Sequence, residues 1–165
     1  MACGHGLLAY ILLLLDNSSP HALAVDCNIP PSAAKLAESL ENDWPRLNNR
    51  VEFKQTDLHD IALRPTDLVV ASHACGELTD LVLAKALAAK ARVAVLPCCH
   101  DLKTADQGGI GGWLDGVLAV DVTRAFKLQA AGYQIYTQQI PAEITPMNRL
   151  LLAEPQQSDA DRSKA

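Results

Sequence analysis

The sequence predicts an α/β fold: a mostly parallel sheet with helices on both faces and an antiparallel strand near the C-terminus. The first observation behind this prediction is that short β-type runs alternate with helical stretches from Val25 onward, a pattern typical of parallel strands joined by crossover helices. The second is that polar residues follow the apolar runs where the predicted strands end. Because open α/β sheets bind ligands beside the carboxyl ends of their strands, the same pattern predicts a binding site.

The composition suits a single globular domain. Of the 165 residues, 49% are hydrophobic and 20% are charged, which allows a substantial core and argues against general disorder. The formal net charge of −5 disfavours a freestanding nucleic-acid binder, whose phosphate contacts need clustered Lys and Arg. Five cysteines, an odd count, indicate reduced thiols and a cytoplasmic protein. We expect a domain over residues 1–154 and a disordered tail over residues 155–165.

The N-terminal elements begin with an apolar run. Leu7 to Leu15 predicts a buried helix that ends at the turn-forming residues 16–20. A signal peptide is the competing interpretation of this run, but no Lys or Arg precedes it and it is shorter than the roughly 20 residues of a membrane span. Next we expect a strand at residues 22–27, a helix at 31–41 with Ser32 available for capping, and a strand at 51–55.

The C-terminal elements continue the alternation. Four glycines within residues 108–112 predict a mobile loop beside the site. The helix that follows, from about Leu118 to Gly132, is expected to turn Val122, Ala125 and Phe126 toward the core. The remaining expected elements are strands at residues 68–72, 92–96, 133–138 and 149–153 and a helix at residues 77–90.

Two glycines stand immediately before the first helix, in Gly4-His5-Gly6, where the backbone can approach a ligand and offer helix N-terminal N–H groups. Asp26 follows twenty residues after Gly6, at the end of the next strand, where a carboxylate can bind both hydroxyls of a ribose. This pair fits any adenosine cofactor. Asp57 ends a third strand at the same sheet edge and is either an adenine contact or a turn former.

Two polar clusters follow later strands, one at residues 72–76 and one at residues 97–100. Both face the predicted cleft. A zinc site is conceivable here, but adjacent cysteines make a poor chelate and the sequence has no Cys-x-x-Cys pair, so we expect no metal ion. The residues concerned are His73, Cys75, Cys98, Cys99 and His100.

Three segments carry a resemblance to a known family: residues 73–80 (His-Ala-Cys-Gly-Glu-Leu-Thr-Asp), residues 98–100 (Cys-Cys-His) and residues 146–151 (Pro-Met-Asn-Arg-Leu-Leu). In this order they resemble the methyltransferase domains that include the eukaryotic tRNA ribose methyltransferase of the acceptor stem, related methyltransferase-like proteins and many bacterial members. Asp121, Arg124, Gly132 and Tyr133 also fit the family's penultimate helix. The resemblance covers roughly residues 2–155.

The resemblance implies a Rossmann-like class I methyltransferase fold that binds S-adenosylmethionine. The glycine turn would line the methionine side of the cofactor, and Asp26 would hold its ribose. The implied cofactor-binding residues are Gly4, His5, Gly6, Asp26, Cys27, Asp57, Leu58, His73, Ala74 and Cys75. The implied catalytic residues, bordering the acceptor, are His73, Cys98, Cys99 and His100.

The family's first strand is missing from the sequence. That strand precedes the glycine turn and lies in the middle of the sheet, yet residues 1–3 leave no room for it. Without it, its neighbours would bury unpaired backbone groups at about 1–3 kcal/mol each. We therefore expect an upstream segment or a partner chain to complete the sheet.

An oxygen acceptor fits the sequence better than a base amine, because no Asn/Asp-Pro-Pro-aromatic segment follows the fourth strand. The resemblance points to RNA, and to a ribose hydroxyl in particular, with His73 or His100 as the general base. Three alternatives stay open: RNA cytosine-C5 methylation with Cys98 or Cys99 as nucleophile, an NAD-dependent oxidoreductase, and a non-catalytic scaffold module. No membrane partner is expected.

Overall fold

The computed structural model describes residues 1–156, and the chain divides into two compact units. The first unit runs from Met1 to Ile61, and the second begins at Ala62. The last strand includes Pro155, and the Gln156 N–H donates to the Gly132 carbonyl at 2.9 Å. Residues 157–165 of the predicted disordered tail lie outside the described residues.

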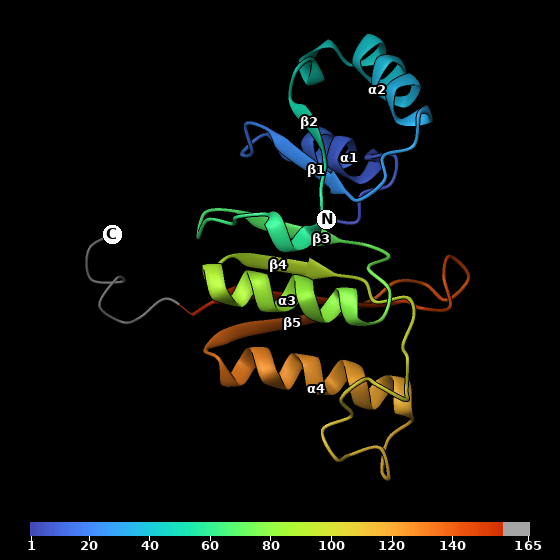
Figure 1. The fold of residues 1–165 in the computed structure, drawn as a ribbon, viewed down its shortest axis with the longest axis vertical. Helices are drawn as coiled ribbons and strands as arrows, with labels where there is room; N and C mark the ends of the chain where they lie inside the picture. Colours follow the sequence, from blue (N-terminus) through green and yellow to red (C-terminus); the bar gives the residue numbers. More distant parts are fainter. Residues whose placement is uncertain (157–165) are drawn as a thin grey trace, which may run out of the picture. The chain divides into compact units, whose positions relative to one another are not determined.

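The first unit contains two parallel strands and two helices (Figure 1). The strands pair in register, with Asp26 opposite Gln55 at their carboxyl ends. A hydrogen bond from the Thr56 N–H to the Asp26 carbonyl, 3.0 Å long, extends this pairing past the last residue of the second strand. The elements are α1 (Leu7–Leu15), β1 (Ala22–Asp26), α2 (Ser32–Asp43), the short 3-10 helix η1 (Pro45–Leu47), β2 (Val51–Gln55) and the short 3-10 helix η2 (Leu58–Asp60).

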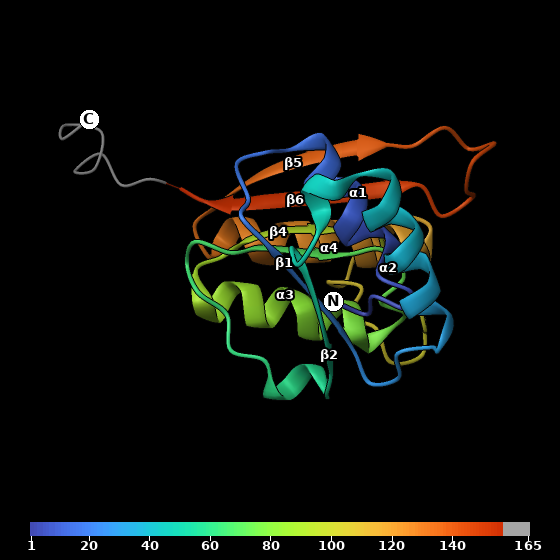
Figure 2. The same cartoon turned by 90° about the horizontal axis from the view of Figure 1, so that it is seen from above.

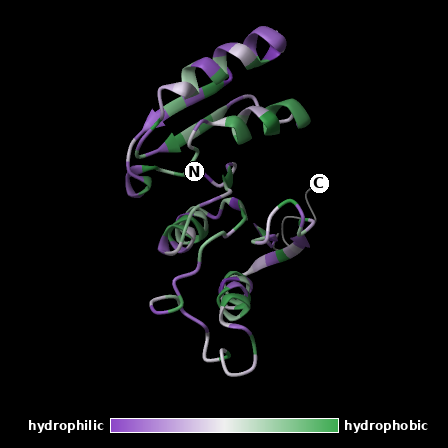
Figure 3. Ribbon diagram, turned by 90° about the vertical axis from the view of Figure 1, so that its right-hand side faces the viewer, coloured by the Kyte–Doolittle hydropathy of each residue, from purple (hydrophilic) through white to green (hydrophobic). Residues whose placement is uncertain are grey.

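Helix α1 supplies most of the core of the first unit. It is green along nearly its whole length in Figure 3, whereas α2 mixes polar and apolar residues. Tyr10 and Leu13 are fully buried against Leu47 of η1. After the last residue of the helix, the carboxylate of Asp16 accepts hydrogen bonds from the N–H and the hydroxyl of Ser18, which forms a turn. Partly buried hydrophobic residues pack around this cluster: Leu14, Ala22, Ala37, Leu40, Val51 and Phe53.

The second unit is a four-stranded sheet with two helices, seen from two directions in Figures 1 and 2. The strand order is β3-β4-β6-β5. β3 and β4 are parallel, while β6 is antiparallel to both of its neighbours. α3 packs on β3 and β4, α4 packs on β5, and the two helices contact each other. The elements are β3 (Leu68–Ala71), α3 (Glu77–Ala89), β4 (Arg92–Val95), α4 (Gly116–Ala130), β5 (Tyr133–Gln139) and β6 (Arg149–Pro155).

The α/β fold class and the late antiparallel strand are confirmed. Two local predictions are wrong. Ser32 makes no capping bond at the start of α2, because its hydroxyl pairs with the His5 ring instead. Val122 and Phe126 are exposed on α4. The buried face of this helix carries instead Ala119, Val120, Thr123, Arg124 and Leu128. None of the helices within residues 1–156 has both the length and the apolar character that a bilayer crossing requires.

Candidate functional site

The glycine turn and the strand-end carboxylate meet in the first unit. The backbone N–H of Gly4 donates to Oδ2 of Asp26 at 2.8 Å, and the N–H of Asn28 donates to Oδ1 at 3.2 Å. Burial raises the pKa of Asp26, but hydrogen bonds from Gly4, Asn28 and Cys27 together outweigh it and hold the pKa below its ordinary value. Asp26 is therefore a carboxylate at neutral pH, and it faces the glycine turn, as expected from the sequence.

The two glycines of the turn do different work. Gly4 has a φ of +50°, and a Cβ built there would have no atom within 4 Å, so this position opens onto free space. Gly6 has a φ of +77° and caps α1, where a Cβ would lie 2.6 Å from two ring carbons of Phe53. Gly6 thus lets the helix start close to β2, and Gly4 leaves room for a ligand beside the carboxylate.

The other cofactor candidates of the first unit lie near the same strand ends. His5 is exposed, and its Nε2 is 2.7 Å from the Ser32 hydroxyl, while the exposed thiol of Cys27 lies 3.6 Å from Oδ1 of Asp26. Asp57 caps the short helix η2 by accepting the His59 N–H at 2.8 Å, so it has the turn-forming role that the sequence allowed. Its neighbour Leu58 is buried.

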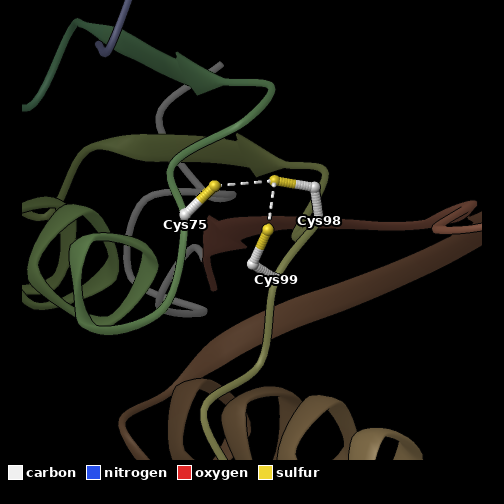
Figure 4. A group of neighbouring side chains, drawn as sticks. All are labelled: Cys75, Cys98 and Cys99. Atoms are coloured by element: carbon white, nitrogen blue, oxygen red, sulfur yellow. Dashed lines mark hydrogen bonds between the residues drawn. The ribbon is translucent and has the colours of Figure 1, made fainter.

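Three cysteine thiols converge in the second unit (Figure 4). The Sγ of Cys98 lies 3.0 Å from that of Cys75 and 3.6 Å from that of Cys99. Cys75 follows β3, and the other two follow β4. The two loops are also joined through backbone, since the Gly76 N–H donates to the Cys99 carbonyl at 3.0 Å.

The loop after β3 is held in an unusual backbone conformation. His73 is exposed and has a φ of +112°, which a residue with a side chain rarely adopts. The next residue, Ala74, is buried, and the hydroxyl of Thr79 donates to its carbonyl. The Cys75 thiol points back to the His73 carbonyl at 3.5 Å. The loop is therefore fixed by contacts with α3 and places a histidine and a thiol at the end of β3.

Burial, with added effects of the neighbouring thiols of Cys75 and Cys99, raises the pKa of the Cys98 thiol to about 12. At neutral pH the Cys98 side chain is then a thiol and not a thiolate. A nucleophilic cysteine needs the opposite shift. This observation counts against Cys98 as the nucleophile of a cytosine-C5 reaction.

His100 is paired with a carboxylate. Its Nε2 lies 2.6 Å from Oδ1 of Asp121 on α4, and its side chain is 1% exposed. Oδ2 of Asp121 accepts the Nε–H of Arg149 at 2.8 Å, and Arg124 lies 3.5 Å from Oδ1. The Nδ1 atom of His100 is buried and has no hydrogen-bond partner. Such an orphaned ring nitrogen is uncommon in a folded protein and marks a functional candidate.

A cavity of about 510 Å³ in the second unit is lined by Asp121, the carboxylate partner of His100. α4 lines it with Leu118, Val122 and Ala125, the face that the sequence had assigned to the core. Asp121 and Arg149 supply charge to the wall, and Gln138 of β5 supplies an amide. The cavity combines an apolar wall with a few polar groups, as small-molecule and nucleotide pockets do.

The sequence did not single out Asp121 and Arg149 as site residues. In the sequence, Asp121 belongs to a helix segment with Arg124, and Arg149 belongs to a late motif. The signal that the sequence offers is an acid close to Arg124 in the first segment and a single basic residue in the second. Their meeting depends on how α4 packs beside β6, which no local pattern reveals.

Comparisons with known proteins bear on the family and the fold. A family model described as "Methyltransferase domain" matches residues 1–105. Among solved structures, an rRNA methylase from Streptococcus thermophilus is similar, with a TM-score of 0.57 and 15% sequence identity over 94% of this chain and 83% of that chain. At this identity the likeness extends to the fold alone. No curated protein matched the chain.

Proposed function

Since its first 105 residues match that family's model, the chain belongs to the methyltransferase-domain family, and from this membership we propose that it is an S-adenosylmethionine-dependent methyltransferase with an RNA ribose hydroxyl as the favoured acceptor. The observation that carries the proposal is the hydrogen bond from the Gly4 N–H to the Asp26 carboxylate. It joins the two features that together suit an adenosyl group.

The residues of the first unit fit the cofactor. Asp26 has its carboxylate oxygens at the end of β1, ionised and only partly buried, so it can accept the two hydroxyl protons of a ribose. Gly4 opens onto free space, which allows close approach of a ligand to the backbone. When bound, S-adenosylmethionine supplies an activated methyl group. The protein's own task is then to align the acceptor and to accept its proton.

His100 is the better placed of the two candidate bases. The Asp121 carboxylate receives the Nε2–H of His100, which leaves the lone pair on Nδ1 free to take a proton. Asp121 also favours the imidazolium that proton transfer produces. His73 has no such partner among the hydrogen bonds and ion pairs found in residues 1–156, although its exposed position leaves it open to substrate.

The cavity beside Asp121 is the site we assign to the acceptor. Arg149 gives it a cation suited to a phosphate, and Gln138 offers an amide that can bind a sugar or base. These groups suit the binding of one nucleotide. A long RNA contact needs a basic surface, which a net charge of −5 disfavours. A further domain or subunit would supply that contact.

Cofactor binding is tested by titration calorimetry with S-adenosylmethionine and with NADH. We expect binding of the first and none of the second. Asp26→Asn should weaken binding about tenfold or more, because charged hydrogen bonds are worth about 1.5–3 kcal/mol. Glu52→Gln, a matched change on exposed β2, should have no effect. NADH binding alone would favour an oxidoreductase, and binding of neither would favour a scaffold.

Acceptor class is tested by incubating the protein with radiolabelled S-adenosylmethionine and RNA, protein or small-molecule fractions of the source cell. We expect label in RNA, with ribose methylation found after nuclease digestion. His100→Ala should lower turnover by about 10²–10⁴ without loss of cofactor affinity, as expected for a general base. Label in protein alone, or full turnover by both His100→Ala and His73→Ala, would contradict the assignment.

A further strand beside β1 belongs to the same proposal. Within residues 1–156, β1 pairs with β2 on one side only. On its other side, the Cys3 N–H reaches the Val25 carbonyl at 3.1 Å, while Leu23 is 41% exposed. We propose that an upstream segment of the natural protein or a partner chain adds a strand to this edge. Amide hydrogen exchange of Leu23 should slow when that segment is present. We propose a cytoplasmic location on the cysteine usage.

A further inference from the structure

We propose that Cys75, Cys98 and Cys99 bind Zn²⁺ as three thiolates, each thiol releasing its proton to solvent as the ion binds, with a fourth coordination position open to water or another ligand. Their three Sγ atoms all lie within 4.8 Å of one another. No disulfide joins them, and all three are free cysteines. The proposal concerns metal binding by this cluster and does not depend on methyl transfer.

The distances suit a shared cation. In a tetrahedral site with Zn–S bonds of about 2.3 Å, two sulfur atoms are about 3.8 Å apart. The measured separations of 3.0 Å and 3.6 Å, with a third pair inside 4.8 Å, lie around this value. Binding of Zn²⁺ would require the Cys75–Cys98 separation to widen from 3.0 Å to about 3.8 Å.

The backbone removes the objection that adjacent cysteines chelate poorly. In a strand, neighbouring side chains point to opposite faces, which would separate Cys98 from Cys99. β4 ends at Val95, however, and the two cysteines lie in the irregular segment that follows. Their sulfurs consequently lie close together: that of Cys98 is directed toward Cys75, and that of Cys99 toward Cys98, as Figure 4 shows.

The loops that carry the thiols are already fixed relative to each other. The Gly76 N–H bonds the Cys99 carbonyl, and α3 begins directly after that glycine. The three ligands are therefore largely in place before a metal ion binds, so that ordering them costs little free energy. Thiolate ligands select soft ions such as Zn²⁺ over Mg²⁺ or Ca²⁺.

Solvent access determines the kind of site. Cys75 and Cys99 are exposed and Cys98 is half-buried. Three protein ligands with an accessible fourth position are typical of zinc sites that exchange a water or bind a further ligand. A cysteine thiolate bound to the ion would at the same time be withheld from nucleophilic attack on a substrate.

The test uses the full chain, reduced with a phosphine and stripped of metal, and titrated with Co²⁺ as a spectroscopic probe. We expect one Co²⁺ per chain, with a thiolate-to-metal charge-transfer band and visible bands of tetrahedral intensity, both abolished by Zn²⁺. Cys75→Ser, Cys98→Ser and Cys99→Ser should each weaken metal binding by at least about 10–100-fold. Replacement of a residue that merely orients a metal ligand already lowers metal affinity by this factor. Cys27→Ser, which removes an exposed thiol of the first unit, should bind normally.

A second measurement covers variants that fold poorly. In the wild-type protein, Zn²⁺ should protect Cys75, Cys98 and Cys99 from alkylation, as mass spectrometry of peptides can show, while Cys27 stays reactive. Absence of the charge-transfer band, equal reactivity of all thiols with and without Zn²⁺, or an intramolecular Cys75–Cys98 disulfide that forms in place of metal binding would overturn the proposal. These readouts need no S-adenosylmethionine, so they remain valid if the proposed methyl transfer fails.

Discussion

Gly6→Ala should destabilise the first unit, because the added methyl group has no room. Gly6 has a φ of +77°, in the left-handed region, and the new Cβ would lie 2.6 Å from two ring carbons of Phe53. The left-handed conformation costs about 1–2 kcal/mol for a residue with a side chain. Overpacking against a ring typically costs about 1–3 kcal/mol more. We therefore expect a loss of about 2–5 kcal/mol in the free energy of unfolding.

Gly4→Ala is the matched control. Its φ is +50°, but no atom lies within 4 Å of the added Cβ. Only the backbone cost of about 1–2 kcal/mol applies. The same methyl group would occupy the space that we assign to the cofactor, so Gly4→Ala should lose affinity for S-adenosylmethionine while keeping most of its stability.

Urea denaturation followed by circular dichroism measures both losses, and calorimetry measures cofactor affinity. In the Gly6→Ala background, Phe53→Leu should restore about 1–3 kcal/mol, since it removes the ring but not the backbone strain. Equal destabilisation by Gly4→Ala and Gly6→Ala, or no recovery with Phe53→Leu, would refute the close approach of the glycine to that ring.

Three further outcomes are expected. Tyr133→Phe should cost about 1–3 kcal/mol in urea denaturation, because its buried hydroxyl lies 3.1 Å from each of two backbone carbonyls that would lose their donor; a change below about 0.5 kcal/mol would contradict this. Burial and the Glu41 carboxylate raise the pKa of Tyr10 from 10.0 to about 12, so the neutral phenol contributes stability that is fully present below pH 10 and is lost as the pH rises through 12. Unfolding measured between pH 9 and 12 should show a loss of stability that Tyr10→Phe lacks, and identical curves would argue against it. Asp121→Asn should lower turnover by about 10²–10⁴, because the His100 imidazole loses the carboxylate that accepts its Nε2–H; unchanged turnover would leave Asp121 a structural role only.

Much of the fold could be predicted because its boundaries are marked by local chemistry. The limits of α1 and β2 were predicted to the residue, since turn formers follow both. Three strands end one residue earlier than predicted, at Asp26, Ala71 and Val95. The residue after each of these was included in the predicted strand because it continued the apolar pattern or closed the segment. The division of the chain into two units was not predicted, because strand pairing depends on contacts distant in sequence.

The candidate site was predicted only in part. The glycine turn and Asp26 lie together, as their spacing indicated. The inward face assigned to α4 was wrong, because periodicity identifies an apolar face but cannot distinguish a core from a cavity wall. Val122 and Ala125 line the cavity instead. The sequence predicted that Cys75, Cys98 and Cys99 face one cleft, but not that both adjacent cysteines join the same cluster, which requires the chain to leave the strand before Cys98.

Asp121 connects three segments that are far apart along the chain: the loop after β4, its own helix and the start of β6. Arg149 both neutralises this carboxylate and lines the cavity. An anionic acceptor that drew Arg149 away would leave Asp121 with Arg124, at 3.5 Å, as its remaining arginine partner. The cavity and the His100–Asp121 pair are thus linked through one arginine, so a ligand bound in the cavity can act on His100, which is not among the residues that line it.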